Sequence, residues 1–242
     1  MERKTNLEEL KKLAVEIVEE IPISKTQFWP AVAQHFFTDC GTYPIPNENG
    51  GFDVGFLEEG SPAYDMWKKD IKERINAATR ASSIYTMVTK PWSLLFVKFA
   101  EPFLSEEEFT DFFKDAYIKM EYPNSDPNFP VDELVSYFEE CDPNLLMSEN
   151  ELEVFNGLPD EVTVYRGVTS NNLDGVEALS WSLSPEKAEW FATRFSSIKG
   201  RVYSATIRKD DIFAYFGLRG EQEVIVNPDY LENIEVYKDF IE

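Results

Sequence analysis

The chain has 242 residues, of which 43% are apolar, including 19 Phe, 11 Tyr and 5 Trp, which is enough for a sizeable core and excludes a disordered chain. Its 45 acidic and 23 basic residues give a net charge of −22, and 28 of the acids and 14 of the bases precede position 151. Such a surface repels nucleic-acid phosphates and anionic membranes and attracts basic proteins, although it is equally consistent with simple solubility or salt tolerance.

The pattern in the first part of the chain predicts mainly helices. Ser105 and Glu108 form a capping box, which begins a helix that runs to about Met120. Residues 41–62 hold five glycines, three prolines and two asparagines and predict a long loop, the best candidate for a mobile element. Residues 92–99 fit either a strand or the end of a buried helix. The other expected helices span residues 6–20, 25–38, 63–80, 131–141 and 148–156.

After Pro159 the pattern changes to the alternation that is typical of strands. Residues 162–165 are the first such segment. One helix interrupts the strands, with Ser184 as its N-cap and Pro185 at its first position. The other expected strands span residues 177–183, 201–207, 222–226 and 233–237.

This order of elements predicts an α+β fold, in which N-terminal helices precede a strand-rich module. We place the helical part at residues 1–150 and the strand-rich module at 151–242, with one continuous domain as the alternative. Cys40 and Cys141 lie far apart and indicate neither a disulfide framework nor a zinc site. Neither an apolar signal core nor a membrane span is present, so we expect a cytoplasmic protein, of its own cell or of a host into which it is delivered.

Glu221 and Glu223 are the most informative residues of the chain. The apolar run that follows them reads as a buried strand, on which alternate residues point to the same face, so the two carboxylates should lean toward one another. Like charges this close repel unless a cationic or polyhydroxyl ligand lies between them. The alternative is a solvated acidic strand edge, because chance pairs are common among 45 acids.

Two upstream features fit the same site. Arg166, followed by Gly167, ends a predicted strand, and Ser180 and Ser182 share one face of another. Arg166 precedes Ser180 by 14 residues, and Ser180 precedes Glu223 by 43. The ordinary alternatives are a surface arginine paired with one of many carboxylates and two solvent-facing serines.

Arginine at a strand end, then Ser-x-Ser, then Glu-x-Glu, all within residues 160–226, resembles the arginine–serine–glutamate class of mono-ADP-ribosyltransferases. That family moves ADP-ribose from NAD onto a protein side chain. Its fold implies that the strand-rich module here is a split β-sheet that clasps NAD, with no metal. Both spacings are short for the family, and Trp181 stands where the family often has threonine.

The resemblance also implies roles for the acidic and hydroxyl side chains. Glu223 would bind the 2′-hydroxyl of the nicotinamide-side ribose and stabilise an oxocarbenium-like species. Glu221 would orient or deprotonate the acceptor, and glutamate here resembles the arginine-modifying branch. Ser180 would donate a hydrogen bond to Glu223 and fix its rotamer.

The cofactor side of the implied site comprises Arg166, Gly167, Ser182 and Phe191. Arg166 would bind the diphosphate of NAD and hold the serine motif, because a guanidinium fork matches phosphate oxygens. Gly167 would let the nicotinamide amide approach the backbone, since it has no Cβ. Phe191 reads first as core and second as a ring that stacks on nicotinamide.

Acceptor recognition is expected at Tyr215 and Phe216, which precede the segment 217–220 where the family has its acceptor-recognition turn. An exposed aromatic there would grip a target protein, and the alternative is that both rings are core. His35 is the single histidine and reads as structural. Its position argues against the related histidine–tyrosine–glutamate branch.

We therefore expect a mono-ADP-ribosyltransferase that uses NAD, with an arginine of a basic target protein as acceptor. The helical part would complete the cofactor cleft and select the target, and no nucleic acid or membrane is expected as a partner. Two alternatives stay open. One is a non-enzymatic acidic inhibitor of a basic protein surface, and the other is an NAD glycohydrolase that uses water as acceptor.

Overall fold

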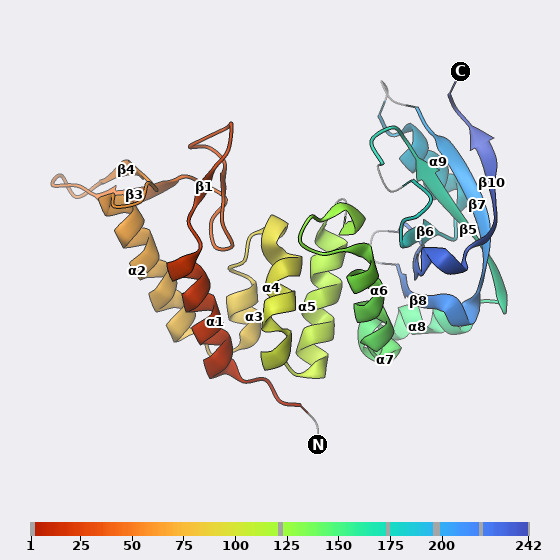
Figure 1. The fold of residues 1–242 in the computed structure, drawn as a ribbon, viewed down its shortest axis with the longest axis horizontal. Helices are drawn as coiled ribbons and strands as arrows, with labels where there is room; N and C mark the ends of the chain where they lie inside the picture. The colour runs from red at the N-terminus through yellow and green to blue at the C-terminus, as the bar shows by residue number, and fades with distance from the viewer. Residues whose placement is uncertain (1–2, 121–122, 173–174, 196–198, 218–219, 242) are drawn as a thin grey trace. The chain divides into compact units, whose positions relative to one another are not determined.

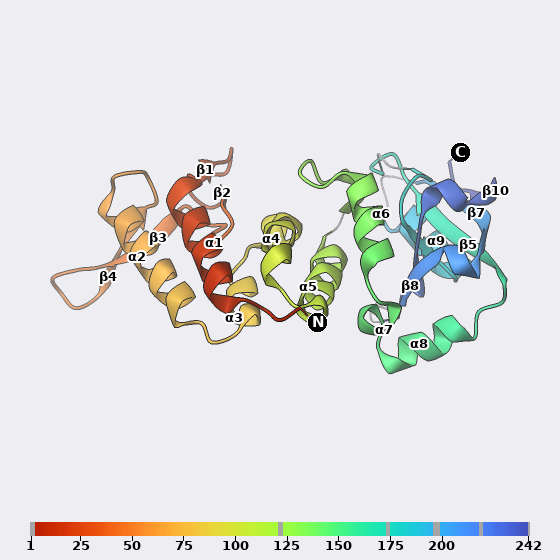
Figure 2. The same ribbon diagram turned by 60° about the horizontal axis from the view of Figure 1, so that its bottom comes forward.

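The computed structural model describes residues 3–120, 123–172, 175–195, 199–217 and 220–241 (Figures 1 and 2). The chain divides into two compact units, Met1–Glu121 and Tyr122–Glu242. The division falls before the boundary expected at residue 150, so the last helices of the expected helical part belong with the strands. Among the described residues, no helix is long and apolar enough to cross a membrane.

The first unit is mainly helical (Figure 1). Its helices begin at side-chain caps where the sequence offers them: Asn6 accepts from the amide of Glu9, and Ser61 from that of Tyr64. The helices of this unit are α1 (Leu7–Glu20), α2 (Pro62–Ala77), α3 (Ala81–Tyr85), α4 (Ser93–Ala100) and α5 (Glu106–Lys119). Its strands are β1 (Ser24–Lys25), β2 (Ala33–Gln34), β3 (Thr42–Pro46) and β4 (Phe52–Phe56). The ambiguous segment 92–99 is therefore mostly helix.

The core of this unit is aromatic. Phe36, Phe96 and Phe113 are fully buried, and Tyr85 stacks on Phe112 with ring centroids 4.5 Å apart. Close packing of large rings among the helices, both stacked and edge-on, buries much apolar area for each residue ordered. The helices therefore hold together without a sheet between them.

The helix expected over residues 25–38 is wrong, because these residues form turns and the short antiparallel pair β1–β2. Pro30 lies in the middle of the segment, where it would remove a helical hydrogen bond. The side chain of Thr26 also competes for the backbone, since its hydroxyl donates to the carbonyl of Val32 at 2.7 Å and accepts from the amide of Phe28.

The loop expected over residues 41–62 is also wrong, because it contains the β3–β4 hairpin. The side chain of Asn47 accepts hydrogen bonds from the amides of Asn49 and Gly51, and Gly50 has a φ of +77°. The glycines and asparagines thus build a tight turn, while the residues on either side pair as strands.

The second unit contains helices and an antiparallel sheet (Figures 1 and 2). The sheet has six strands in the order β10-β7-β5-β6-β9-β8. Its helices are α6 (Val131–Glu140), α7 (Pro143–Leu146), α8 (Glu149–Asn156) and α9 (Pro185–Thr193). Its strands are β5 (Glu161–Val168), β6 (Ser180–Ser182), β7 (Arg201–Arg208), β8 (Ile212–Phe216), β9 (Glu223–Val226) and β10 (Glu232–Asp239). The α+β class is confirmed, and β8 is the strand that the sequence pattern did not reveal.

Contacts of α6–α8 with β8 explain where the chain divides. Phe138 of α6 stacks on Phe213 of β8 with ring centroids 5.9 Å apart. The amide of Tyr215 approaches the sulfur of Met147 to 3.2 Å. Apolar packing and backbone contacts therefore attach these helices to the sheet.

Candidate functional site

Three neighbouring strands bring the predicted site residues together. Tyr165 of β5 lies opposite Ser182 of β6, and Ser182 lies opposite Glu223 of β9. Residues directly opposite one another on antiparallel strands project to the same face, so the Ser182 and Glu223 side chains share one side of the sheet. Ser180 shares that side, since it is two residues from Ser182 on the same strand.

Ser180 and Glu223 are in direct contact. The Ser180 hydroxyl donates a hydrogen bond to Oε1 of Glu223, across 43 residues of sequence. This is the contact that the resemblance predicts between the two residues, whereas their chemical roles stay predictions. A hydroxyl bonded to one carboxylate oxygen fixes the rotamer of the glutamate without removing its charge.

Arg166 holds the backbone on which Ser180 stands. Its Nε donates to the carbonyl of Gly175 at 2.7 Å, and its guanidinium also donates to the carbonyl of Ser180 at 2.6 Å. The guanidinium of Arg166 thus contacts the backbone of the serine motif, whereas its role in binding NAD stays a prediction. These bonds join Arg166, Ser180 and Glu223 into one connected set.

Glu221 lies outside the strand, so the alternation expected for the glutamate pair does not hold. Gln222 has a φ of +51°, which interrupts the extended backbone, and β9 begins only at Glu223. The turn is nevertheless tied to β6: the Ser182 hydroxyl donates to the carbonyl of Glu221 at 2.6 Å, and the amide of Leu183 donates to that of Gln222 at 2.9 Å. The position of Glu221 is thus fixed by hydrogen bonds to the backbone of the turn.

Ser182 is buried, and its hydroxyl bonds this turn and also accepts from the amide of Ser184 at 3.1 Å. Its expected place on the cofactor side is therefore better described as support for the Glu221 backbone. Trp181, on the opposite side of β6, is buried and donates to the carbonyl of Ala178 at 3.0 Å.

Gly167 is required for the approach of α9 to β5. A Cβ at this position would lie 2.1 Å from the carbonyl oxygen of Ala188 and 2.7 Å from the amide nitrogen of Ala192. The missing Cβ therefore makes room for a helix backbone, which is a different reason from the expected approach of a nicotinamide. Phe191 lies beside this contact, because its own Cβ is 3.0 Å from the same point, and its side chain is half-buried.

Arg194, at the end of α9, is a candidate residue that sequence reasoning missed. Its guanidinium lies over the rings of Phe195, Phe191 and Trp190, at 4.8, 5.2 and 5.7 Å from their centroids. Trp190 is 53% exposed and Phe195 40% exposed. The signal in the sequence is the arginine three residues after Phe191, a spacing that places both on one side of a helix.

Tyr215 and Phe216 do not form an exposed acceptor-binding turn. Both lie in β8 and are buried, at 8% and 3% exposed, and Phe216 lies opposite Glu223. Burial, with a smaller effect from the Glu151 carboxylate, raises the pKa of Tyr215 above its usual value. As neighbours on one strand they project to opposite faces of the sheet, and Phe216 shares the Glu223 side. Leu218 and Arg219, which belong to the expected turn, lie outside the described residues.

Glu151, a buried carboxylate of α8, binds the backbone at Gly217, directly after the end of β8. It accepts from the amide and hydroxyl of Ser148 at 2.9 and 2.8 Å, as in a capping box, and from the amide of Gly217 at 2.9 Å. One side chain thus caps α8 and fixes the residue at which the chain leaves β8. The spacing Ser148-x-x-Glu151 could have revealed the cap but not the second bond.

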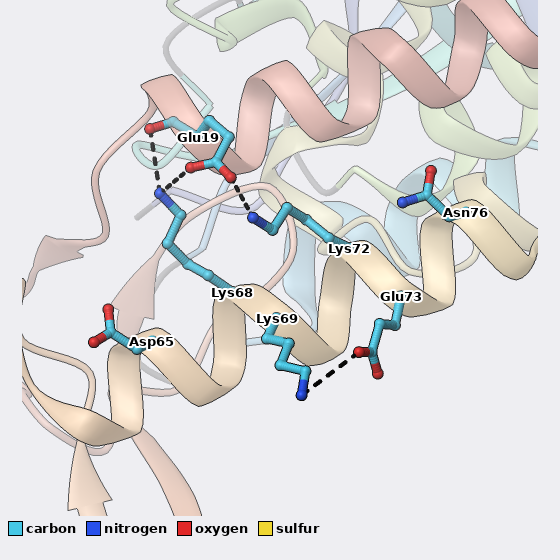
Figure 3. A pocket seen from close by; sticks show the side chains of 7 residues that line it. All are labelled: Glu19, Asp65, Lys68, Lys69, Lys72, Glu73 and Asn76. Carbon is cyan, nitrogen blue, oxygen red and sulfur yellow. Dashed lines mark hydrogen bonds and ion pairs between the residues drawn. The ribbon is translucent and has the colours of Figure 1, made fainter.

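Glu223 lines neither of the two cavities that the described residues form. In the first unit, a cavity of about 350 Å³ between α1 and α2 has lysines 68 and 72 paired with Glu19 (Figure 3). Those ion pairs lower the pKa of Glu19 and occupy both ammonium groups. A second cavity, of about 430 Å³, lies at β5, β7 and the start of β10 in the second unit, with four carboxylates in its lining. Among the described residues, no cluster of three or more His, Cys, Asp or Glu could hold a metal ion.

Comparisons of the chain with protein-family models, with curated proteins and with solved structures found no match.

Proposed function

We propose that the second unit is the catalytic module of a mono-ADP-ribosyltransferase, which uses NAD as substrate and a protein side chain, in the first place an arginine, as acceptor. The observation that carries the proposal is the connected set in which Arg166 bonds the Ser180 backbone and the Ser180 hydroxyl bonds Glu223. If the three short motifs had occurred by chance, their residues would not be expected to contact one another.

In the proposed reaction, the bond between C1′ of the ribose and the nicotinamide nitrogen breaks, and its electron pair neutralises the pyridinium as nicotinamide leaves. The nucleophile, an arginine nitrogen, then bonds C1′ and loses a proton. Glu223, held by Ser180, stabilises the positive charge that develops on the ribose. Glu221 is the carboxylate that would accept the proton, and Ser182 holds its backbone.

Arg166 and Arg194 supply the positive charge that an anionic dinucleotide needs in so acidic a chain. Arg166 braces Ser180, while Arg194 stands on α9 next to Phe191, whose Cβ approaches Gly167. The half-buried ring of Phe191 and the exposed ring of Trp190 offer flat apolar surface for a nicotinamide or adenine. We assign Arg194 rather than Arg166 as the first candidate to contact the diphosphate, because Arg166 already donates to the backbone carbonyls of Gly175 and Ser180.

The test is to incubate the full chain with NAD and measure nicotinamide release, with and without a cell lysate as source of acceptors. Glu223→Gln keeps the shape of the side chain and removes its charge, so we expect release to fall at least 100-fold, about 2.7 kcal/mol of transition-state stabilisation. Glu153→Gln, at an exposed position of α8 in the same unit, is the matched control and should leave release unchanged. Equal release by Glu223→Gln and wild type would remove the site assignment.

An NAD glycohydrolase is the second candidate, and one observation favours it. Tyr215 and Phe216, which were expected to grip an acceptor, are buried. With water as nucleophile the same site would release nicotinamide and ADP-ribose without labelling any protein. Labelled NAD and a lysate separate the two functions, since only a transferase produces labelled protein bands.

A further inference from the structure

The β3–β4 hairpin of the first unit exposes a continuous apolar face. On β4, alternate residues Phe52, Val54 and Phe56 are 70%, 73% and 51% exposed. Pro46 lies opposite Phe52 and Pro44 opposite Val54, so both exposed prolines share that face. These five residues form what we call the hairpin face. Large apolar side chains gathered on one exposed side of a ribbon are typical of an interaction site.

The opposite side of the hairpin packs against α2. A Cβ at Gly55 would lie 2.4 Å from the side chain of Ile45 and 2.6 Å from Ala63 at the start of α2, so this side packs closely against the helix. Tyr43, on the same side, has its pKa raised by burial and by the nearby Asp70 of α2. The alternation of a strand therefore buries one side on α2 and leaves the hairpin face outward.

The charges around the hairpin face are mainly acidic. The sequence has no Lys or Arg from residue 26 to residue 67, and the hairpin carries Glu48 in its turn and Glu58 and Glu59 just after β4. Glu58 pairs with Lys25 at 2.6 Å. The ends of the face are thus acidic, in a chain of net charge −22. This pattern disfavours a second copy of the chain or an anionic membrane as the occupant, because both would oppose like charges.

We propose that the hairpin face docks a partner protein whose contact surface has an apolar centre and Lys or Arg at its edge. Apolar burial supplies the affinity, and the acidic ends of the face set the orientation and speed the encounter. The inference goes beyond the proposed function, because this contact needs neither NAD nor Glu223. A binding protein without catalysis would use it in the same way.

The experiment uses the full chain and a defined probe. A five-residue strand spans about 17 Å, so a helix of about 14 residues covers it at ~1.5 Å per residue. The probe is a fluorescent helical peptide of that length with leucines on one face and flanking lysines, and its counterpart carries glutamates in place of the lysines. Anisotropy titrations compare wild type with Val54→Ser and Phe52→Ser. Val236→Ser is the matched control, since Val236 is a 50% exposed strand valine in the other unit.

We expect saturable binding of the lysine peptide, at least tenfold weaker for Val54→Ser and for Phe52→Ser, unchanged for Val236→Ser, and weaker at high salt. The glutamate peptide should bind at least tenfold more weakly than the lysine peptide. Unfolding midpoints should not change in the hairpin variants, because both side chains are exposed.

Equal binding by Val54→Ser and Val236→Ser overturns the proposal. The proposal is also overturned if the lysine peptide fails to bind and the wild-type chain instead associates with itself or binds anionic lipid vesicles in a way that Val54→Ser abolishes. Nicotinamide release by Val54→Ser should equal that of wild type. If the chain binds the peptide but releases no nicotinamide, the result supports docking at the hairpin face and contradicts the proposed catalysis. Failure of the docking proposal and failure of the proposed function are therefore distinguishable.

Discussion

Ser180 is the residue on which the geometry of Glu223 depends, because its hydroxyl donates directly to the carboxylate. Ser180→Ala removes one hydrogen bond to a charged group, an interaction worth about 1.5–3 kcal/mol. We expect kcat for nicotinamide release to fall about 10- to 100-fold, with a smaller change in KM for NAD. Steady-state kinetics with Thr193→Ala as control, which removes an exposed hydroxyl of α9, checks this. A Ser180→Ala variant that releases nicotinamide with the kcat of wild type would show that the contact is purely structural.

His35 makes the stability of the first unit depend on pH. It is fully buried, its Nδ1 accepts from the amide of Phe37 at 3.0 Å, and its ring meets Trp67 edge-on at 5.1 Å. Burial lowers its pKa to about 4, from 6.5 in the unfolded chain. The unfolded chain therefore takes up a proton as the pH falls through 6.5, whereas the folded unit does so only near 4. Stability is full above pH 6.5 and is lost progressively down to pH 4.

We expect the free energy of unfolding of this unit to drop by about 2 kcal/mol between pH 7 and pH 5. Urea titrations of the full chain, followed by tryptophan fluorescence at both pH values, measure it. His35 is the single histidine, so His35→Gln should remove most of the dependence in this range. An unchanged pH dependence in His35→Gln would assign the effect to carboxylates.

At the scale of elements, the packing of α9 on β5 depends on Gly167. The nearest atoms to a Cβ there are backbone atoms of α9, which cannot rotate away as a flexible side chain would. Gly167→Ala therefore has to displace the helix that carries Phe191 and Arg194. We expect a loss of at least about 2 kcal/mol in the free energy of unfolding, together with weaker NAD binding.

Gly157→Ala is the matched control, because a Cβ there meets nothing closer than 3.4 Å and Gly157 has a φ of −77°. Its unfolding midpoint should lie close to that of wild type. Chemical denaturation of both variants makes the comparison, and a Gly167→Ala protein as stable as Gly157→Ala would contradict the close approach of α9.

Across the whole molecule, the net charge of −22 is the dominant electrostatic feature. If this charge steers a basic target, transfer to that target should slow as salt rises from 0.1 to 1 M, where the Debye length falls from about 10 to about 3 Å. Nicotinamide release without a target should change less, because the reacting groups are fixed next to one another. Rates of protein labelling and of nicotinamide release, measured in parallel, test this. Equal salt dependence of the two rates would mean that charge does not select the partner.

Much of the local structure follows from the sequence because it rests on short-range patterns. The helices at 6–20, 63–80 and 131–141 have apolar residues at helical spacing, and the start of α9 follows from Ser184 and Pro185. The order of Arg166, Ser180 and Glu223 was also readable, but Arg166 does not end its strand as expected, because β5 continues through Gly167 to Val168. What failed locally was the segment 25–62, where a helix was expected over residues 25–38 and a long loop over residues 41–62, whereas both stretches form short strands joined by turns.

The tertiary structure alone decided which face each element buries and which residues meet across the chain. The sequence by itself determined the α+β class, the acidic charge, most helices and the residues worth testing. Pairing across 43 residues set the contact of Ser180 with Glu223, and the burial of Tyr215 and Phe216 followed from a strand that the pattern had not revealed. The division of the chain likewise depended on α6–α8 packing against β8. The physical reason is that propensity and periodicity act over a few residues, whereas burial and register are properties of the assembled sheet.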